Sequence, residues 1–328
     1  MYLHGIGHFH PENEITNEFL GELDIGTSDD WIMERTGIRS RRTVLSLDYI
    51  REKRNQDVRA AAEAAAYTNA ELGRRAGEMA IARAGIDPSE VGLVIGGGCA
   101  PDRVTPAEGC DVAAALDIDA PAFDLRSACT SFTAAVHLLS QMRPDRVPPY
   151  VLIVQMESLT RVIDYNDRRS AVLFGDGAAA AVVSASVPGR ATFLHCTLGS
   201  SPRGHAKVVI PWAGHFDQEG ATVQSFAIKR TVNELRAIRK EFDGEAGGRM
   251  YFIGHQANRL MLESVCRQCD IPDELHLSNV ADFGNTGTAG APAVLSDHWQ
   301  AFEAGDQVTM VGVGAGLTWA SANLRFEI

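Results

Sequence analysis

The sequence has few of the features that mark secreted, membrane-spanning or nucleic-acid-binding proteins. Six cysteines in 328 residues are too few and too irregularly spaced for a disulfide framework. No apolar run reaches membrane-spanning length, and no basic stretch followed by an apolar segment opens the chain. The formal charge of −12 at pH 7 argues against a nucleic-acid partner. We therefore expect a cytoplasmic protein with no signal peptide, no membrane association and no nucleic acid.

Metal-binding patterns are also scarce. Cys266 and Cys269 form a single C-x-x-C with no second pair or suitable histidine nearby, which disfavours zinc. His4, His8 and His10 alternate in a segment whose glycines disfavour a helix, so we read a first strand there and no metal site. With 45% hydrophobic and 22% charged residues, the chain has the composition of a globular protein of one large or two ordinary domains.

Apolar periodicity divides the chain into short strand-like runs and longer helix-like segments. Strands are predicted at 1–10, 91–95, 121–125, 151–154 and 178–183, and again at 250–253, 275–280 and 308–311, before a closing segment at 317–326. Helices are predicted at 57–84 with an interruption near Gly73, at 106–116, after Cys129, and at 225–242, 258–269 and 287–295. Residues 45–57 are polar and irregular, which indicates a loop.

The order of these elements repeats. Ile95 and Ile253, Cys129 and Asn285, and Ile153 and Met310 are separated by 156–158 positions. The repeat predicts an α/β protein with two related halves, residues 1–184 and 185–328, each with a mostly parallel sheet covered by helices on both faces. Functional groups gather at the carboxyl ends of parallel strands. Cys129, His255 and Asn285 each follow a predicted strand, so we expect them to meet.

Cys129 lies at a predicted strand-to-helix turn, where backbone N–H groups and the helix dipole favour a thiolate. The residues alone leave simpler readings open: Cys129 as a small buried thiol, His255 as a core histidine and Asn285 as a turn former. Asp176, between two glycines in an apolar run, is read as a structural carboxylate bonded to backbone rather than a catalytic acid.

Six motifs resemble the β-ketoacyl-acyl-carrier-protein synthase III family of the thiolase superfamily, over nearly the whole chain. They are Thr27-Ser-Asp-Asp-Trp-Ile with Arg35-Thr-Gly-Ile-Arg39, Ser127-Ala-Cys-Thr, Phe174-Gly-Asp-Gly-Ala, His255-Gln-Ala-Asn258, Gly284-Asn-Thr286 and Gly314-Ala-Gly-Leu-Thr-Trp319. The resemblance implies a thiolase fold, with two αβαβα halves in a five-layered arrangement, and a homodimer without metal or redox cofactor.

The resemblance also implies a two-step reaction. Cys129 takes an acyl group from an acyl-CoA or an acyl carrier protein, and a malonyl thioester then decarboxylates and condenses with it to give a β-ketoacyl product. The backbone N–H groups of Cys129 and Gly316 match the family's oxyanion hole, and the His255 and Asn285 side chains match the donors that stabilise the enolate. Four further residues match the coenzyme A and pantetheine contacts: Trp31, Arg35, Arg168 and Asn258.

Some positions depart from the family pattern. Thr105 stands where many members have a bulky aromatic residue that enters the partner's acyl pocket, which implies a roomier pocket. The loop at 45–66 is longer than usual. Both favour specialised-metabolite or accessory fatty-acid biosynthesis over primary initiation. Arg259 displaces an arginine often used for carrier-protein docking by one position, so docking there is open.

Three alternatives remain. The first is acyl transfer to an alcohol or amine. The second is a non-decarboxylative Claisen condensation, for which Glu108 is a weaker candidate base than the glutamate some relatives place at 105. The third is a silent acyl-carrier-binding partner.

Overall fold

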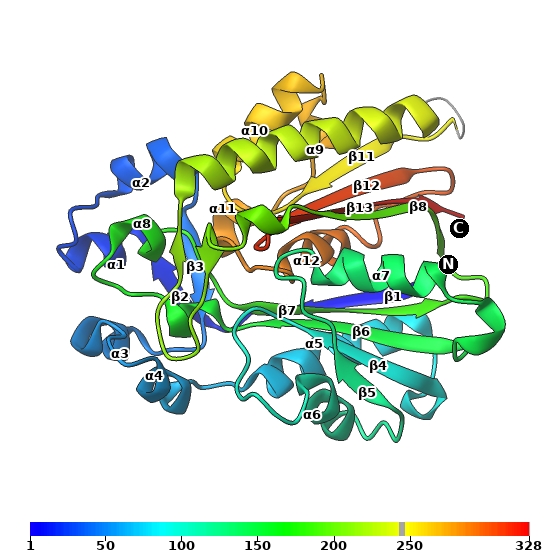
Figure 1. Ribbon diagram of the computed structural model, residues 1–328, viewed down its shortest axis with the longest axis horizontal. Coiled ribbons are helices and arrows are strands. Elements are labelled where there is room, and N and C mark those ends of the chain that lie inside the picture. The colour runs from blue at the N-terminus through cyan, green and yellow to red at the C-terminus, as the bar shows by residue number, and fades with distance from the viewer. Residues whose placement is uncertain (243–246, 328) are drawn as a thin grey trace.

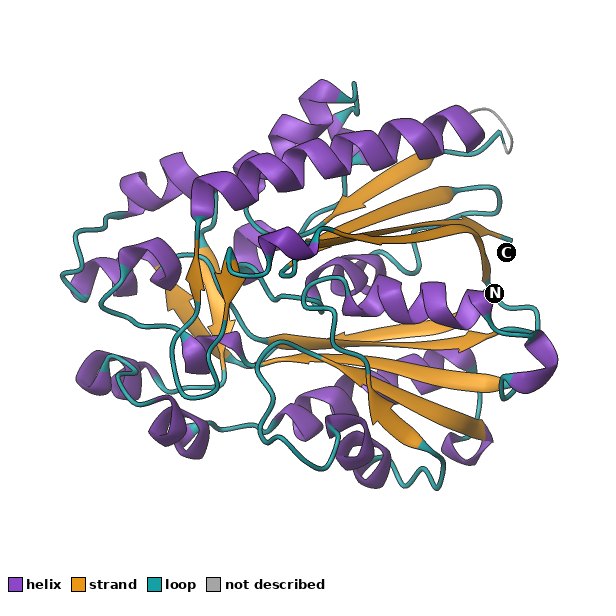
Figure 2. Cartoon of the chain, viewed as in Figure 1, coloured by secondary structure: helices purple, strands orange, loops and turns teal. Residues whose placement is uncertain are grey.

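The computed structural model describes residues 1–242 and 247–327. Within these residues the chain forms one nine-stranded sheet in the order β11-β12-β13-β8-β1-β7-β6-β4-β5 (Figures 1 and 2). The first half of the chain contributes β1 (Tyr2–Phe9), β4 (Val91–Gly97), β5 (Ala122–Asp124), β6 (Tyr150–Glu157) and β7 (Gly177–Ser184). The second half contributes β8 (Ala191–Ser200), β11 (Met250–Gly254), β12 (Gln307–Gly314) and β13 (Thr318–Phe326).

The two halves have the same strand order, except that the second has no counterpart of β5. The first half runs β5-β4-β6-β7-β1 from its edge, and the second runs β11-β12-β13-β8. They join where β1 pairs with β8, at Tyr2 with Thr192 and Leu3 with Ala191. Strand β7 ends at Ser184 and β8 begins at Ala191. The division into residues 1–184 and 185–328 stays a prediction.

The expected mostly parallel sheets are wrong, because only three of the strand pairs described here are parallel: β4 with β5, β4 with β6, and β11 with β12. The connection from β6 to β7 contains only the short turn Leu159–Val162 and α8 (Arg168–Ala171), so no long crossover helix returns the chain to the same direction. β12 and β13 are joined by a tight turn and pair antiparallel.

Helices and sheet alternate in five layers, as Figure 1 shows. On one outer face, α5 (Asn69–Ala84) packs on β1, β6 and β7, and α6 (Glu108–Ala115) packs on β4 and β5. Between the halves lie α7 (Ser131–Gln141), against β6 and β8, and α12 (Gly290–Asp297), against β1, β7 and β11. On the other outer face, α9 (Gly220–Phe242) packs on β12 and β13, and α10 (Arg259–Gln268) packs on α9. The predicted five-layered thiolase fold is confirmed.

The apolar residues gather in layers that match this arrangement. One cluster joins α5 and α6 to the first half of the sheet, around residues such as Leu72 and Leu152. A second fills the space between the halves, where Phe132 and Val294 of the two central helices meet. The third lies under α9 and α10 and contains Cys266 and Cys269. Helices α7 and α12 pack against strands of both halves, so the positions of the segments that lead into them are fixed by this packing.

The expected strand at 275–280 is wrong. His276 forms only an isolated bridge with Phe252, between the turn Asp273–Leu275 and helix α11 (Val280–Phe283). The amide oxygen of Gln256 accepts hydrogen bonds from Ser278 Oγ and from the backbone N–H groups of Asn279 and Val280. These donors are therefore not available to a neighbouring strand.

The region before α5 also differs from expectation. Residues 45–57 contain helix α3 (Leu47–Lys53), capped by Ser46, where a loop was expected. The predicted helix at 57–84 is two helices, α4 (Val58–Ala64) capped by Asp57 and α5 capped by Thr68, so the break is not at Gly73. A Cβ at Gly73 would lie 2.8 Å from Val112 and 2.9 Å from Met156, so this glycine serves close packing inside α5.

The remaining elements are short. They are α1 (Asn17–Glu22), α2 (Asp29–Thr36), α11, two two-stranded antiparallel sheets, and turns at Pro88–Glu90, Pro144–Arg146 and Pro202–Gly204. The small sheets pair β2 (Asn13–Thr16) with β3 (Ser40–Thr43), and β9 (Val208–Val209) with β10 (Asp217–Gln218). No helix in the described ranges is long and apolar enough to cross a membrane.

Candidate active site

Cys129 lies in a tight turn between β5 and α7 that several hydrogen bonds define. Ala128 has φ 47°, a left-handed conformation that costs a non-glycine residue energy. The turn is closed by Ser131 Oγ, which accepts from Ser127 N at 2.8 Å and donates to Ala128 O at 2.7 Å. The start of α7 is further tied to the second half of the chain, because Phe132 N donates to Thr288 Oγ1. The sulfur is thus presented at the start of a helix, as predicted.

His255 and Asn285 come from two loops in the second half of the chain, after β11 and after α11. His255 follows β11 directly and is buried. Two backbone hydrogen bonds hold Asn285 in place. Its N–H donates to Leu173 O at 2.8 Å, and its carbonyl accepts from Gly175 N at 3.1 Å. The side-chain Oδ1 of Asn285 accepts from Gly287 N at 3.0 Å, which leaves the two Nδ2 hydrogens as the donors that face the cavity.

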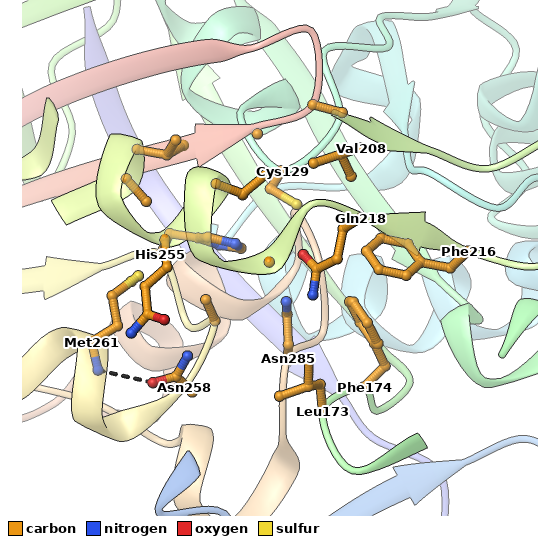
Figure 3. Close-up of a pocket in the computed structure, with 18 of the residues that line it drawn as sticks. Cys129, Leu173, Phe174, Val208, Phe216, Gln218, His255, Asn258, Met261 and Asn285 are labelled. Carbon is orange, nitrogen blue, oxygen red and sulfur yellow. Dashed lines mark hydrogen bonds between the residues drawn. The ribbon is translucent and has the colours of Figure 1, made fainter. Parts of the chain in front are cut away.

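Cys129, His255 and Asn285 line one cavity of about 230 Å³. Figure 3 shows their side chains around the same space, with Phe174, Phe216 and Gln218 on another wall. Gly314 approaches the turn so closely that a Cβ there would lie 2.9 Å from Cys129 N. A side chain at 314 would therefore press on the Cys129 amide. The structure brings together the three residues that the sequence predicts as a catalytic set.

Cys99, which sequence reasoning did not connect to the site, lies against Cys129. Both residues line one cavity, and the interaction between their thiols is the largest cause of a Cys129 pKa well below the ordinary thiol value. Burial raises the pKa of Cys129, and the His255 ring lowers it. The same interaction, together with burial, raises the pKa of Cys99. Cys129 is therefore the more acidic thiol of the pair.

Glu157, at the end of β6, is a second residue that sequence reasoning missed. It is fully buried, and its two oxygens accept from Cys99 N and Thr288 N, each at 2.9 Å. Burial, followed by the Cys129 charge, raises the pKa of Glu157 to about 8. A Cβ at Gly287 would lie 2.3 Å from Glu157 Oε1, so only glycine fits beside this carboxyl group. Glu157 links the loops that carry Cys99 and Asn285.

The predicted coenzyme A contacts gather at the cavity mouth. The guanidinium carbons of Arg35 and Arg168 lie 4.5 Å and 4.9 Å from the centre of the Trp31 ring. Arg35 and Asn258 line the cavity itself. Asn258 Oδ1 caps α10 by accepting from Met261 N at 2.8 Å, as the dashed line in Figure 3 marks. An aromatic ring flanked by arginines can bind a nucleotide by stacking and charge pairing.

Three other predicted residues are not among those that line this cavity. Gly314 and Ala315 line the cavity with Cys129, whereas Gly316 is not among its lining residues. Thr105 is exposed in the loop before α6 and lines none of the cavities described here. Glu108 is buried and accepts from Asn69 Nδ2 at 2.7 Å and Asp102 N at 2.9 Å, so its carboxyl group secures the loop at 99–107. Burial raises its pKa to about 7.

The carboxyl group of Asp176 has the structural position expected of it. It is fully buried and accepts from the backbone N–H groups of Val44 and Thr160, each at 2.8 Å. The two histidine side chains of β1 also have protein partners. His4 contacts Val187 O, and His8 contacts Ser296 Oγ and Asp297. The described residues contain no group of three or more histidine, cysteine or acidic side chains that could bind a metal ion.

A second cavity of about 220 Å³ adjoins the first, since Cys129, Phe174, Val208, Phe216 and Ala315 line both. Cys99, Cys129 and Arg126 line it with a mainly apolar set: Gly98, Ala128, Leu159, Phe174, Val208, Val209, Ile210, Phe216 and Ala315. Cys99 and Arg126 also line a third cavity, whose wall includes Val58 and Arg59 of α4. The long segment at 45–66 therefore reaches the surroundings of this second cavity.

Comparisons with known proteins agree with this geometry. Residues 123–202 match the family described as 3-oxoacyl-[acyl-carrier-protein] synthase III, and residues 249–326 match the C-terminal part of the same synthase. The chain is 32% identical over 334 residues to a β-ketoacyl-[acyl-carrier-protein] synthase III of Roseiflexus sp. strain RS-1, covering 96% of this chain and 95% of the relative.

Solved structures give the same result. The crystal structure of the 3-oxoacyl-[acyl-carrier-protein] synthase III of Aquifex aeolicus superimposes with a TM-score of 0.87 at 27% identity, covering 99% of both chains. The priming β-ketosynthase of the R1128 polyketide pathway superimposes with a TM-score of 0.82 at 27% identity, covering 99% of this chain and 96% of the other.

Proposed function

Because the chain belongs to the β-ketoacyl-[acyl-carrier-protein] synthase III family and is therefore an acyltransferase-type condensing enzyme, we propose that it joins a Cys129-bound acyl group to a malonyl thioester. The observation that supports this proposal most strongly is the convergence of Cys129, His255 and Asn285 on one cavity from three separate loops of the chain. The first half-reaction needs a thiolate nucleophile and donors for the oxyanion. The second half-reaction needs donors for the enolate oxygen.

In the first half-reaction the Cys129 thiolate attacks the thioester carbonyl of the acyl donor. The carbonyl oxygen becomes an oxyanion, which the Cys129 N–H stabilises together with a second backbone donor that we assign to Gly316. The tetrahedral intermediate collapses, the C–S bond to the donor breaks, and the donor leaves as its thiolate. The lowered pKa of Cys129 supports this step, because it raises the fraction of the thiol present as the nucleophilic thiolate.

In the second half-reaction a malonyl thioester occupies the cavity that the donor has left. Loss of carbon dioxide leaves an enolate whose oxygen accepts hydrogen bonds from His255 and from Asn285 Nδ2. The enolate carbon then attacks the acyl–Cys129 carbonyl, and Cys129 leaves as a thiolate while the β-ketoacyl thioester forms. Two side-chain N–H donors suit this task because they stabilise the negative charge on the enolate oxygen.

The acyl donor is an acyl-CoA or an acyl carrier protein. Trp31, Arg35 and Arg168 at the mouth support coenzyme A, and we assign the acyl chain to the second cavity beside Cys129. Its largely apolar lining suits an aliphatic or aromatic acyl group. We infer an accessory or specialised-metabolite role from Thr105, from the additional helices α3 and α4, and from the likeness to a polyketide-priming synthase.

We further propose a homodimer. Strand β5 is an edge of the sheet, and Phe123 on it is 46% exposed. Val104, next to Thr105, is 66% exposed. An exposed sheet edge flanked by large apolar side chains is suited to pairing with a second copy. In such a dimer Thr105 would serve the partner's acyl pocket, which its position on this chain permits.

The test is intact-mass analysis after incubation with a panel of acyl-CoAs. We expect one acyl adduct per chain, lost in Cys129→Ala and retained in Cys110→Ser, a matched exposed cysteine. Absence of any adduct with all donors would favour a silent carrier-binding subunit. An adduct that passes to an alcohol or amine without carbon dioxide release would favour simple acyl transfer. A non-decarboxylative condensation is less well supported, because Glu108 is occupied in the loop at 99–107.

A further inference from the structure

Two cysteines lie side by side at the reacting centre although the proposed reaction uses only one. Parallel strands β4 and β5 place them there: Gly96 pairs with Asp124, and Leu125 N donates to Gly96 O at 2.8 Å. Cys99 comes three residues after Gly96, and Cys129 follows the same strand edge through the turn after Leu125. Both cysteines are half-buried and line the second cavity, so small solutes can reach them.

The two thiols differ in chemical character. Cys129 is the more acidic thiol of the pair, whereas the neighbouring Cys129 and burial raise the pKa of Cys99. Cys99 is also fixed from its backbone, because its N–H donates to the buried Glu157 carboxyl group. An acidic thiol beside a less acidic, positioned thiol is the arrangement of a peroxide-sensitive cysteine with its resolving partner.

We propose that Cys99 and Cys129 form a reversible disulfide when the enzyme meets hydrogen peroxide, and that this modification switches off acylation while protecting Cys129. The inference rests on the proposed function insofar as Cys129 is the acyl acceptor. The disulfide itself is a property of the pair and can form whether or not the enzyme condenses anything.

The steps balance in atoms and electrons. The Cys129 thiolate attacks one peroxide oxygen, the O–O bond breaks, and Cys129 becomes a sulfenic acid while hydroxide leaves and takes a proton from the solvent buffer to become water. The sulfur has lost two electrons and peroxide has gained them. Cys99 sulfur then attacks the sulfenic sulfur, the S–S bond forms, the S–O bond breaks, and hydroxide leaves with the Cys99 proton as water. A dithiol reductant reverses the modification by thiol–disulfide exchange.

The sequence provides a direct assay, because trypsin places the three nearby cysteines on separate peptides. Cys99 lies on Ala84–Arg103, Cys110 on Val104–Arg126 and Cys129 on Ser127–Arg146. After brief exposure to hydrogen peroxide and alkylation of free thiols, we expect Ala84–Arg103 joined to Ser127–Arg146, with a loss of about 2 Da relative to the sum of the two reduced peptides. Prior acylation with an acyl-CoA should prevent this product.

Cys99→Ser and Cys110→Ser are the matched variants. In wild type and Cys110→Ser, dithiothreitol should restore acyl-adduct formation after peroxide treatment. In Cys99→Ser, Cys129 should proceed to sulfinic acid, and recovery should be at least about tenfold lower. The proposal is overturned if wild type gives sulfinic acid without the cross-linked peptide, if Cys129 joins the Cys110 peptide instead, or if Cys99→Ser recovers as well as wild type. An enzyme that forms the disulfide but never accepts an acyl group would refute the proposed function alone.

Discussion

Replacing Asn285 by aspartate should impair decarboxylation while leaving acylation of Cys129 nearly intact. Asn285 Oδ1 accepts from Gly287 N at 3.0 Å, and an aspartate oxygen at the same place can accept this bond. The turn is therefore preserved. What is lost is the Nδ2 group, which is the donor proposed for the enolate oxygen.

The expected magnitude follows from the chemistry of a single oxyanion donor. Removing one such donor costs about 3 kcal/mol of transition-state stabilisation, which is roughly a hundredfold in rate. The aspartate also brings a negative charge toward a developing anion, so the loss should be at least this large. Acylation should change by only a few fold, because its oxyanion is assigned to backbone N–H groups.

Two assays and one control separate these effects. Intact mass over time gives the rate of acyl–Cys129 formation, and trapped carbon dioxide gives the rate of decarboxylation. Gln218→Glu makes the same amide-to-acid change in the same cavity, at a residue with no role assigned in the reaction, and should cause a smaller loss. If Gln218→Glu and Asn285→Asp slow carbon dioxide release equally, charge alone explains the effect and the donor role of Asn285 is refuted.

Three further predictions concern the surroundings of the site. The pH midpoint for alkylation of Cys129 by iodoacetamide should lie well below the ordinary thiol range. Cys99→Ala should move this midpoint upward, because it removes the largest cause of the low Cys129 pKa. An unchanged midpoint would contradict the role of Cys99. Asn258→Ala should lower the free energy of unfolding in urea titrations by about 1 kcal/mol, because the α10 cap is lost. Asn258→Asp should retain the cap and the stability. Equal losses in the two variants would argue against capping. Because burial raises the pKa of Glu157 from 4.5 to about 8, the native state binds the extra proton in this range, so its stabilising contribution is present below pH 4.5 and lost as pH rises toward about 8. Glu157→Gln should therefore flatten the decline in unfolding free energy over that window, and a parallel profile for the two proteins would rule the protonation out.

Much of the site could be predicted from sequence because its residues follow apolar strands. Cys129 and His255 come after such runs, which form β5 and β11, and the repeat of the chain relates Asn285 to Cys129 although helix α11, not a strand, precedes Asn285. The five layers follow from the same alternation of strands and helices. Strand direction could not be predicted in this way, because parallel and antiparallel strands have similar apolar patterns when both sheet faces are buried.

Other features depend on tertiary contacts that leave little trace in a single sequence. Helix α3 buries only Ile50 within its length, so its periodicity was too weak to distinguish it from a polar loop. Glu157 ends an apolar strand, and its importance arises from Cys99 and Thr288, which are distant in the chain. One signal for Cys99 was present: it follows Gly96-Gly97-Gly98 at a strand end, in the same manner as the predicted catalytic residues.

The central claim is that acyl–Cys129 condenses with a malonyl thioester, and a single-turnover experiment tests it most directly. Enzyme carrying a full complement of acyl–Cys129, freed of excess donor, is mixed with malonyl-CoA or a malonyl carrier protein, and carbon dioxide and β-ketoacyl thioester are measured together. We expect one carbon dioxide and one β-ketoacyl thioester for each acyl–Cys129 consumed. Loss of the acyl adduct without carbon dioxide, with any malonyl donor, would contradict it.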